Sequence, residues 1–349
     1  MILSLWEHIN KLKSEIAGIS RNAVLDMFDE DLCQKIDERS KTESYIKLQL
    51  VEIISHLMEA GINHTAHMEH AFSLYNEVQI FDHLQQKCNI HPVKRSKKSN
   101  TPDFTITSKD NTNINLELKT LFAADSVNLI RDVQKQFFEM NVKREAIQKG
   151  VLPSHTDVSA NWNFFKKPGQ EEVRRFDMIE LLYSKLDKSN TLKQLNYQGN
   201  PSILMVDFAA YDYIFCPQEA LPYFIYPSFH SAMVSGLFWH LCFGREGERL
   251  MEMPEEMDMG RPCLGTEMKR DGLLYKYPEI KAMIIGIKYR KGKRLVGLHT
   301  ARMEDPAVLN TLYEICEFVN NDFNTEYFRI GYDPRIKYWP DDTDYSSTV

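Results

Sequence analysis

Two short stretches decide how this chain is interpreted: TPDFTIT, residues 101–107, and LELK, residues 116–119. Residues 108–113 between them, SKDNTN, are of the types that favour a turn. We therefore predict two strands joined as a hairpin. Because side chains alternate between the two faces of a strand, Glu117 and Lys119 share one face, and Asp103 can reach it from the paired strand.

Two carboxylates and one ammonium group on a sheet face suit a divalent metal and the activation of water beside a phosphate. We predict that Asp103 and Glu117 bind Mg²⁺, and that the backbone carbonyl of Leu118 adds a ligand from the same strand. Lys119 would orient the attacking water and neutralise the scissile phosphate. The alternative is a surface hairpin with an ordinary Glu–Lys pair. The leucines on either side of Glu117 argue against it, because unpaired charge is costly in a central strand.

The order of the predicted elements resembles the PD-(D/E)xK phosphodiesterase superfamily. That order is a helix over 64–87, a short strand over 88–94, the two strands of the hairpin, a further helix and a continuous apolar strand over 202–208. The matching residues are Pro102-Asp103 and Glu117-Leu118-Lys119, and the resemblance covers residues 65–210. It implies an α/β fold with a restriction-endonuclease-like core, in which helices flank a mixed central sheet.

In that superfamily the helix before the first strand often carries a glutamate that also faces the metal site. Two residues are candidates here, Glu77 and Glu69. Glu77 shares a helical stripe with apolar side chains that would face the sheet, whereas Glu69 falls on a more polar arc. We therefore add Glu77 to the predicted catalytic and metal-binding residues. The alternative for either residue is a solvated charge on a helix surface.

Three segments are predicted along the 349 residues. Residues 1–62 form an N-terminal helical segment in which apolar residues recur every three to four positions, and residues 63–215 form the nuclease core. Residues 216–349 are an α+β elaboration of that core or an accessory domain, and they include a hairpin with strands at 282–287 and 294–299.

Composition favours a cytoplasmic protein. The six cysteines are scattered without a C-x-x-C pair, which is typical of reduced thiols. The N-terminus lacks the basic region of a secretory signal, and the longest apolar run, residues 231–244, is too short to span a bilayer. We therefore expect no membrane association. We also expect the histidines at 64, 67 and 70, with Glu69, to be surface residues instead of a metal cluster.

The net charge of −7 counts against a large DNA-coating surface, but a nuclease needs only a local basic track. Residues 94–98, KRSKK, and the basic residues Arg131, Lys135, Lys143 and Arg144 are candidates for one. The chain has no G-x-x-x-x-G-K-[ST] motif and no recognisable methyltransferase glycine motif. Energy use or modification would therefore come from a partner protein, such as an ATPase, a sensor or a methyltransferase.

The residues and the resemblance together predict a Mg²⁺-dependent endonuclease, with Mn²⁺ as a substitute, that cuts DNA. The resemblance further suggests a prokaryotic restriction or anti-phage defence system, in which the flanking regions serve homodimerisation, target selection or partner docking. Two alternatives remain open. One is a catalytically inactive nucleic-acid-binding or scaffold protein of the same fold, and the other is an RNA-cutting nuclease with the same site.

Overall fold

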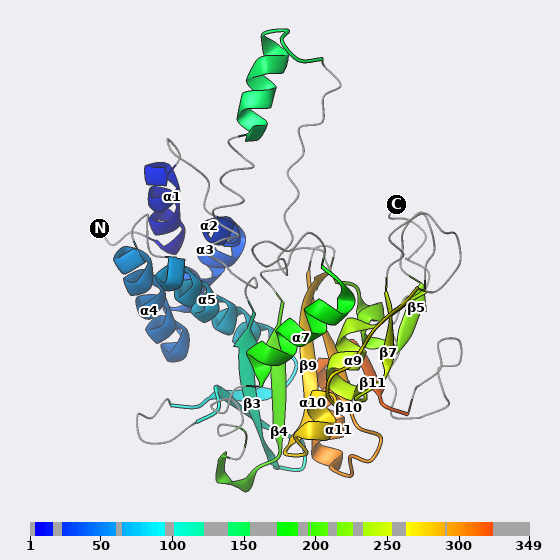
Figure 1. Ribbon diagram of the computed structural model, residues 1–349. Helices are drawn as coiled ribbons and strands as arrows, with labels where there is room; N and C mark the ends of the chain where they lie inside the picture. The colour runs from blue at the N-terminus through cyan, green and yellow to red at the C-terminus, as the bar shows by residue number, and fades with distance from the viewer. Residues whose placement is uncertain are drawn as a thin grey trace. The chain divides into compact units, whose positions relative to one another are not determined.

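The chain packs as two compact units. The first comprises Met1–Asp82 and Phe122–Glu171, and the second His83–Leu121 and Glu172–Val349. We call them the helical unit and the sheet unit. The predicted segments 1–62, 63–215 and 216–349 do not coincide with these two units, and they stay a prediction. The computed structural model (Figure 1) describes residues 4–16, 23–60, 65–94, 101–121, 139–153, 173–187, 195, 197–208, 215–225, 233–252, 263–289 and 292–323.

The described residues of the N-terminal part of the helical unit form a series of helices. They are α1 (Leu5–Ile16), α2 (Ala23–Asp26), α3 (Glu30–Arg39) and α4 (Ser44–Ala60). Helix α3 has a narrow apolar stripe, because only Cys33 and Ile36 of its ten residues are buried. Its start is fixed by Asp29, whose Oδ1 accepts a hydrogen bond from the backbone N–H of Leu32 at 3.1 Å.

Helix α5 (Thr65–Gln85) confirms the helix predicted over 64–87. It is buried on more than one side, since five consecutive residues, 74–78, are all buried. Residues 139–148, which follow the predicted hairpin, are also helical. No helix in the described ranges is long and apolar enough to cross a membrane.

A seven-stranded mixed sheet forms the centre of the sheet unit, in the order β1-β2-β3-β4-β9-β10-β11. Strand β2 is antiparallel to both β1 and β3, and β4 is parallel to both β3 and β9. Strand β10 is antiparallel to β9, and β11 is parallel to β10. The strands are β1 (Asn89–Pro92), β2 (Phe104–Thr107), β3 (Asn113–Thr120), β4 (Ser202–Asp207), β9 (Ile280–Tyr289), β10 (Gly292–His299) and β11 (Phe318–Asn321). The predicted α/β class, with helices flanking a mixed central sheet, is confirmed.

The C-terminal region extends this same sheet, because β9, β10 and β11 all lie beyond residue 215. Strand β4, predicted to be buried on both faces, is buried at every position and pairs with β3 and β9. The predicted hairpin corresponds to β9 and β10, and helix α11 (Pro306–Ile315) packs against β9, β10 and β11. Three further helices belong to this unit: α7 (Arg175–Leu186), α9 (Leu237–Phe243) and α10 (Leu273–Lys276).

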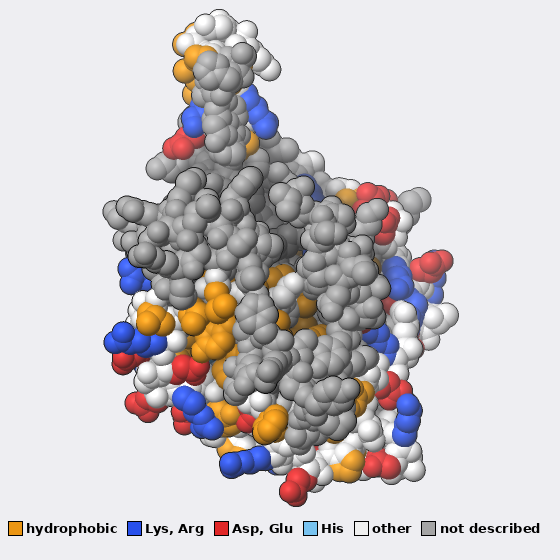
Figure 2. Space-filling view, turned by 90° about the vertical axis from the view of Figure 1, so that its right-hand side faces the viewer, with side chains coloured by type: hydrophobic (Ala, Val, Ile, Leu, Met, Phe, Trp, Pro, Cys, Tyr) orange, Lys and Arg blue, Asp and Glu red, His pale blue; other side chains and the backbone are white. Residues whose placement is uncertain are grey.

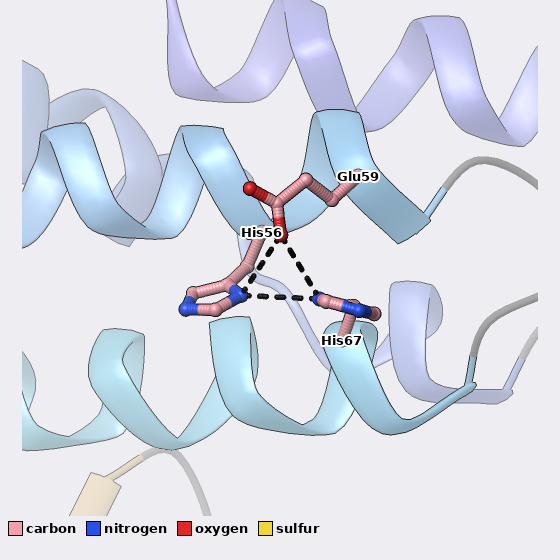
Figure 3. Close-up of side chains that lie close together, drawn as sticks. All are labelled: His56, Glu59 and His67. Atoms are coloured by element: carbon pink, nitrogen blue, oxygen red, sulfur yellow. Dashed lines mark hydrogen bonds and ion pairs between the residues drawn. The ribbon is translucent and has the colours of Figure 1, made fainter.

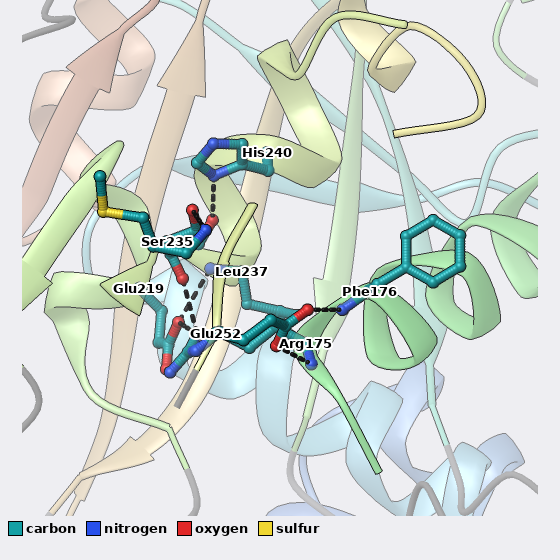
Figure 4. Close-up of polar contacts among 9 residues, drawn as sticks. Arg175, Phe176, Glu219, Ser235, Leu237, His240 and Glu252 are labelled. Atoms are coloured by element: carbon teal, nitrogen blue, oxygen red, sulfur yellow. Dashed lines mark hydrogen bonds and ion pairs between the residues drawn. The ribbon is translucent and has the colours of Figure 1, made fainter. Parts of the chain in front are cut away.

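A buried ion pair joins helix α7 to Glu219, in the short 3-10 helix Pro217–Ala220, beside two small antiparallel sheets (Figure 4). Those sheets are formed by β5 (Tyr223–Ile225) with β6 (Met233–Ser235), and by β7 (Arg249–Glu252) with β8 (Cys263–Glu267). The guanidinium of Arg175 donates to both carboxylate oxygens of Glu219, at 2.7 and 3.0 Å. It also donates to the backbone carbonyl of Ser235 at 2.7 Å. Such a bidentate pair with added hydrogen bonds offsets the cost of burying both charges.

Glu252, the last residue of β7, caps the first turn of α7 (Figure 4). Its carboxylate accepts hydrogen bonds from the backbone N–H groups of Arg175 and Phe176, at 2.7 and 3.1 Å. These donors have no partner inside their own helix, and a carboxylate at this end also interacts favourably with the helix dipole. The network therefore has a structural explanation and requires no ligand.

Candidate functional site

Asp103 immediately precedes strand β2. In the antiparallel ladder Phe104, the first residue of β2, pairs with Leu116, the residue before Glu117. The chain bends at Asp103, although its carbonyl still accepts a hydrogen bond from the N–H of Val93 at 3.0 Å. The two predicted metal-binding residues therefore flank the same cross-strand pair.

The side chain of Asp103 is held against β3 by a hydrogen bond. The backbone N–H of Leu118 donates to its Oδ2 at 2.9 Å. In a strand, the N–H and C=O of one residue point towards the same neighbouring strand. The carbonyl of Leu118 therefore points to the side on which Asp103 lies. This direction is the one required for the predicted backbone ligand.

Glu117 is completely buried and paired. Its side chain has 0% exposure, and the ammonium group of Lys119, 29% exposed, donates to its Oε1. On the other side β3 pairs with β4, where Leu204 and Val206 lie beside Glu117 and Lys119. An ordinary surface pair would leave the glutamate in water. The structure instead places its carboxylate in the sheet interior, where the ammonium group beside it offsets part of the cost of burial.

Glu77 lies in the helical unit, whereas the three strand residues lie in the sheet unit. Its side chain is buried, with 8% exposure, and its Oε1 accepts a hydrogen bond from the hydroxyl of Tyr45 at 2.6 Å. A solvated surface charge is therefore the wrong description of Glu77. The hydrogen bond to Tyr45 gives it a role in packing α4 against α5, and its role as a metal ligand stays a prediction.

Asp207 projects to the opposite face of the sheet. It pairs with Thr120, the neighbour of Lys119 in sequence, and strand side chains alternate. Its carboxylate is fully buried and forms an ion pair with Lys293 at 2.7 Å. Gly286 makes room for this pair, since a Cβ there would lie 2.4 Å from Asp207 Oδ2. Asp207 therefore does not belong to the cluster of Asp103, Glu117 and Lys119, because its side chain lies on the other face of the sheet.

The described basic residues form no continuous track on the face shown in Figure 2, where acidic and basic side chains are interspersed around a hydrophobic area. Of the candidate run 94–98, only Lys94 is described, and it is exposed. Lys143 and Arg144 are exposed as well, whereas Arg131 and Lys135 lie outside the described residues. A basic track for a nucleic-acid backbone therefore stays a prediction.

The structure brings together one group that sequence reasoning missed. His56 and Glu59 of α4 meet His67 of α5, with the three nitrogen and oxygen atoms within 4.8 Å of one another (Figure 3). The sequence prediction concerns the histidines at 64, 67 and 70, expected to be surface residues, and His64 lies outside the described residues. The available signal was the i, i+3 spacing of His56 and Glu59 on the preceding helix, followed by a short connection to His67.

Comparison of the chain with protein-family models, curated proteins and solved structures finds no match.

Proposed function

We propose that this protein is a Mg²⁺-dependent phosphodiesterase with a restriction-endonuclease-like core, and that it cuts DNA endonucleolytically. One observation carries the proposal. The carboxylate of Asp103 accepts a hydrogen bond from the backbone N–H of Leu118, the residue between Glu117 and Lys119, and these two side chains share one face of β3. The three residues of the short sequence pattern are therefore brought together at one strand.

The order of elements supports the same core. Helix α5, the antiparallel strands β1, β2 and β3, helix α7 and the parallel strand β4 follow one another in the order that the resemblance implied. The glutamate and the lysine lie on β3, between the aspartate-bearing strand and the fully buried β4. A core strand surrounded by other strands is a rigid support for a catalytic group.

The donor set fits Mg²⁺. Asp103 and Glu117 would hold the ion through carboxylate oxygens, and Leu118 through its backbone carbonyl. Oxygen-only donors of this kind suit magnesium, and manganese also accepts them. When bound, the ion would supply Lewis-acid activation of water and stabilisation of negative charge on the phosphate. The fit rests on the chemistry of these residues and on the direction of the Leu118 carbonyl inferred from the hydrogen bond of Leu118 N–H.

Lys119 has the role of positioning and charge neutralisation. Its ammonium is held by Glu117 Oε1, so the strand and the ion pair together restrict where its charge can lie. A positively charged group fixed beside a scissile phosphate stabilises the charge that develops in the transition state. Placement of the enzyme in a prokaryotic restriction or anti-phage system is part of the proposal and rests on the resemblance alone.

The test is cleavage of supercoiled plasmid and of a structured RNA by purified protein with Mg²⁺ or Mn²⁺. Asp103→Ala should abolish cleavage, and Asp110→Ala, in the turn between the same two strands, is the matched control that should cut normally. Cleavage of RNA alone would assign an RNA-cutting enzyme. Absence of cleavage by the wild type with either metal, alone and with the products of neighbouring genes, would favour an inactive binding or scaffold protein.

A further inference from the structure

We propose that His56, Glu59 and His67 form a Zn²⁺ site that joins helices α4 and α5 of the helical unit. The three side chains approach one another from two consecutive helices, as Figure 3 shows. His56 and Glu59 are one turn apart on α4, and His67 lies near the start of α5. Its three residues differ from Asp103, Glu117 and Lys119, which belong to the sheet unit.

The distances agree with tetrahedral zinc. Ligand atoms about 2.0–2.1 Å from Zn²⁺ at tetrahedral angles are roughly 3.3–3.4 Å from one another. Here Nδ1 of His56 and Nδ1 of His67 are 3.2 Å apart, and Nδ1 of His67 is 3.4 Å from Oε2 of Glu59. The third distance, from His56 Nδ1 to the same carboxylate oxygen, is 4.0 Å. Because the Glu59 side chain is 56% exposed, a small rotation of that side chain can shorten this distance.

The donor atoms favour a particular class of metal ion, and the exposure of the side chains lets that ion reach the site. Two imidazoles and one carboxylate suit zinc and neighbouring transition metals, whereas magnesium and calcium prefer oxygen donors. The side chains of His56 and His67 are 27% and 41% exposed, so an ion can enter from solvent. A water molecule can occupy the fourth position, as in zinc sites with three protein ligands.

A third histidine supports the orientation of the site. The ring of His70, one turn after His67 on α5, lies edge-on against the ring of His56, with 4.3 Å between centroids and 84° between planes. This contact restricts rotation of the His56 ring whose Nδ1 faces His67. Ring orientation of a ligating histidine is commonly fixed by neighbouring groups in this way. We assign His70 a positioning role.

The consequence for the fold is a cross-link at the end of a helical hairpin. The ligands lie near the end of α4, which ends at Ala60, and near the start of α5, which begins at Thr65. A metal bound by both helices would stabilise the folded hairpin over the unfolded chain, since the ligands come together only when the helices pack. The rival explanation of the short Nδ1–Nδ1 distance is a proton shared between the two rings, with no metal.

The experiment uses untagged full-length protein, because a histidine tag would itself bind zinc. The protein is dialysed against a chelator and titrated with Zn²⁺ by calorimetry, and Co²⁺ is added separately to record its visible absorption. We expect one equivalent of Zn²⁺ to bind and an intense tetrahedral Co²⁺ spectrum to appear. Both should persist in Asp103→Ala, which separates this site from the proposed nuclease site.

The ligand variants decide the outcome. His67→Ala and Glu59→Gln should weaken Zn²⁺ binding at least tenfold and remove the tetrahedral Co²⁺ bands. His70→Ala, which removes a neighbouring histidine but no ligand, should retain one equivalent. Glu59→Gln keeps the shape of an exposed side chain, so it tests the site even if a histidine variant fails to fold. Absence of a Zn²⁺ step in the wild type, or a step equal in wild type and Glu59→Gln, would overturn the proposal.

Discussion

Substitution of Lys119 by methionine should affect both activity and stability, for one electrostatic reason. Methionine keeps much of the aliphatic length and removes the charge. In the wild type the ammonium contacts a carboxylate whose side chain has 0% exposure. Without it, Glu117 either stays ionised in the sheet interior or takes up a proton. Both outcomes cost free energy relative to the paired state.

The expected loss of stability is about 2 kcal/mol. Breaking a fully buried pair costs about 3–5 kcal/mol, whereas a hydrogen bond to a charged group is worth about 1.5–3 kcal/mol. Lys119 retains 29% exposure, so solvent screens part of the interaction and the lower range applies. The second substitution Glu117→Gln in the same protein should recover most of the loss, because it removes the buried charge that the first substitution left unpaired.

Urea unfolding of the wild type, both single variants and the double variant measures this coupling directly. Mg²⁺ should stabilise Lys119→Met more than the wild type, because a bound cation replaces the missing positive charge. DNA cleavage by Lys119→Met should fall by roughly 10²–10³-fold, the usual effect of removing one group that stabilises transition-state charge. The reasoning is refuted if Lys119→Met cuts at the wild-type rate, or if Glu117→Gln adds to the stability loss instead of relieving it.

Three further predictions concern the sheet unit. Arg175→Met leaves a buried carboxylate without its guanidinium partner and should cost about 3–5 kcal/mol in urea unfolding, without changing Zn²⁺ binding. Burial alone would raise the pKa of Glu248, but the hydrogen bond and charge of His240 hold it below the ordinary value. The stability advantage of the wild type over E248Q should therefore be full above about pH 5 and should disappear as the pH falls through the lowered pKa, measured by unfolding at several pH values. Gly286→Ala should destabilise the sheet by about 1–3 kcal/mol in urea unfolding, because the new methyl group would displace the Asp207 carboxylate; unchanged stability would contradict the assigned close contact.

Several elements were predictable because their signals are local. The buried strand over 202–208, helix α5 and the hairpin of β9 and β10 each carry the periodicity or turn residues of their type within a few positions. Helix α3 carries a weaker local signal, because its apolar stripe is narrow and only two of its residues are buried. Position 77 was chosen from its helical stripe, and its burial agrees with that choice. The hydrogen bond from Tyr45 depends on a second helix that the stripe cannot specify.

The sequence by itself determined that Glu117 and Lys119 share a face, since alternation along one strand follows from backbone geometry alone. Tertiary structure decided what faces them. The pairing of β2 with β3 brings Asp103 to Leu118, whose backbone N–H donates to its carboxylate, and the pairing of β3 with β4 puts Asp207 on the face opposite to Glu117. Tertiary structure also joined His56 to His67 and set β9 beside β4. Partner choice of this kind depends on packing and hydrogen bonding between separate segments, and a one-residue change of register would reverse every face.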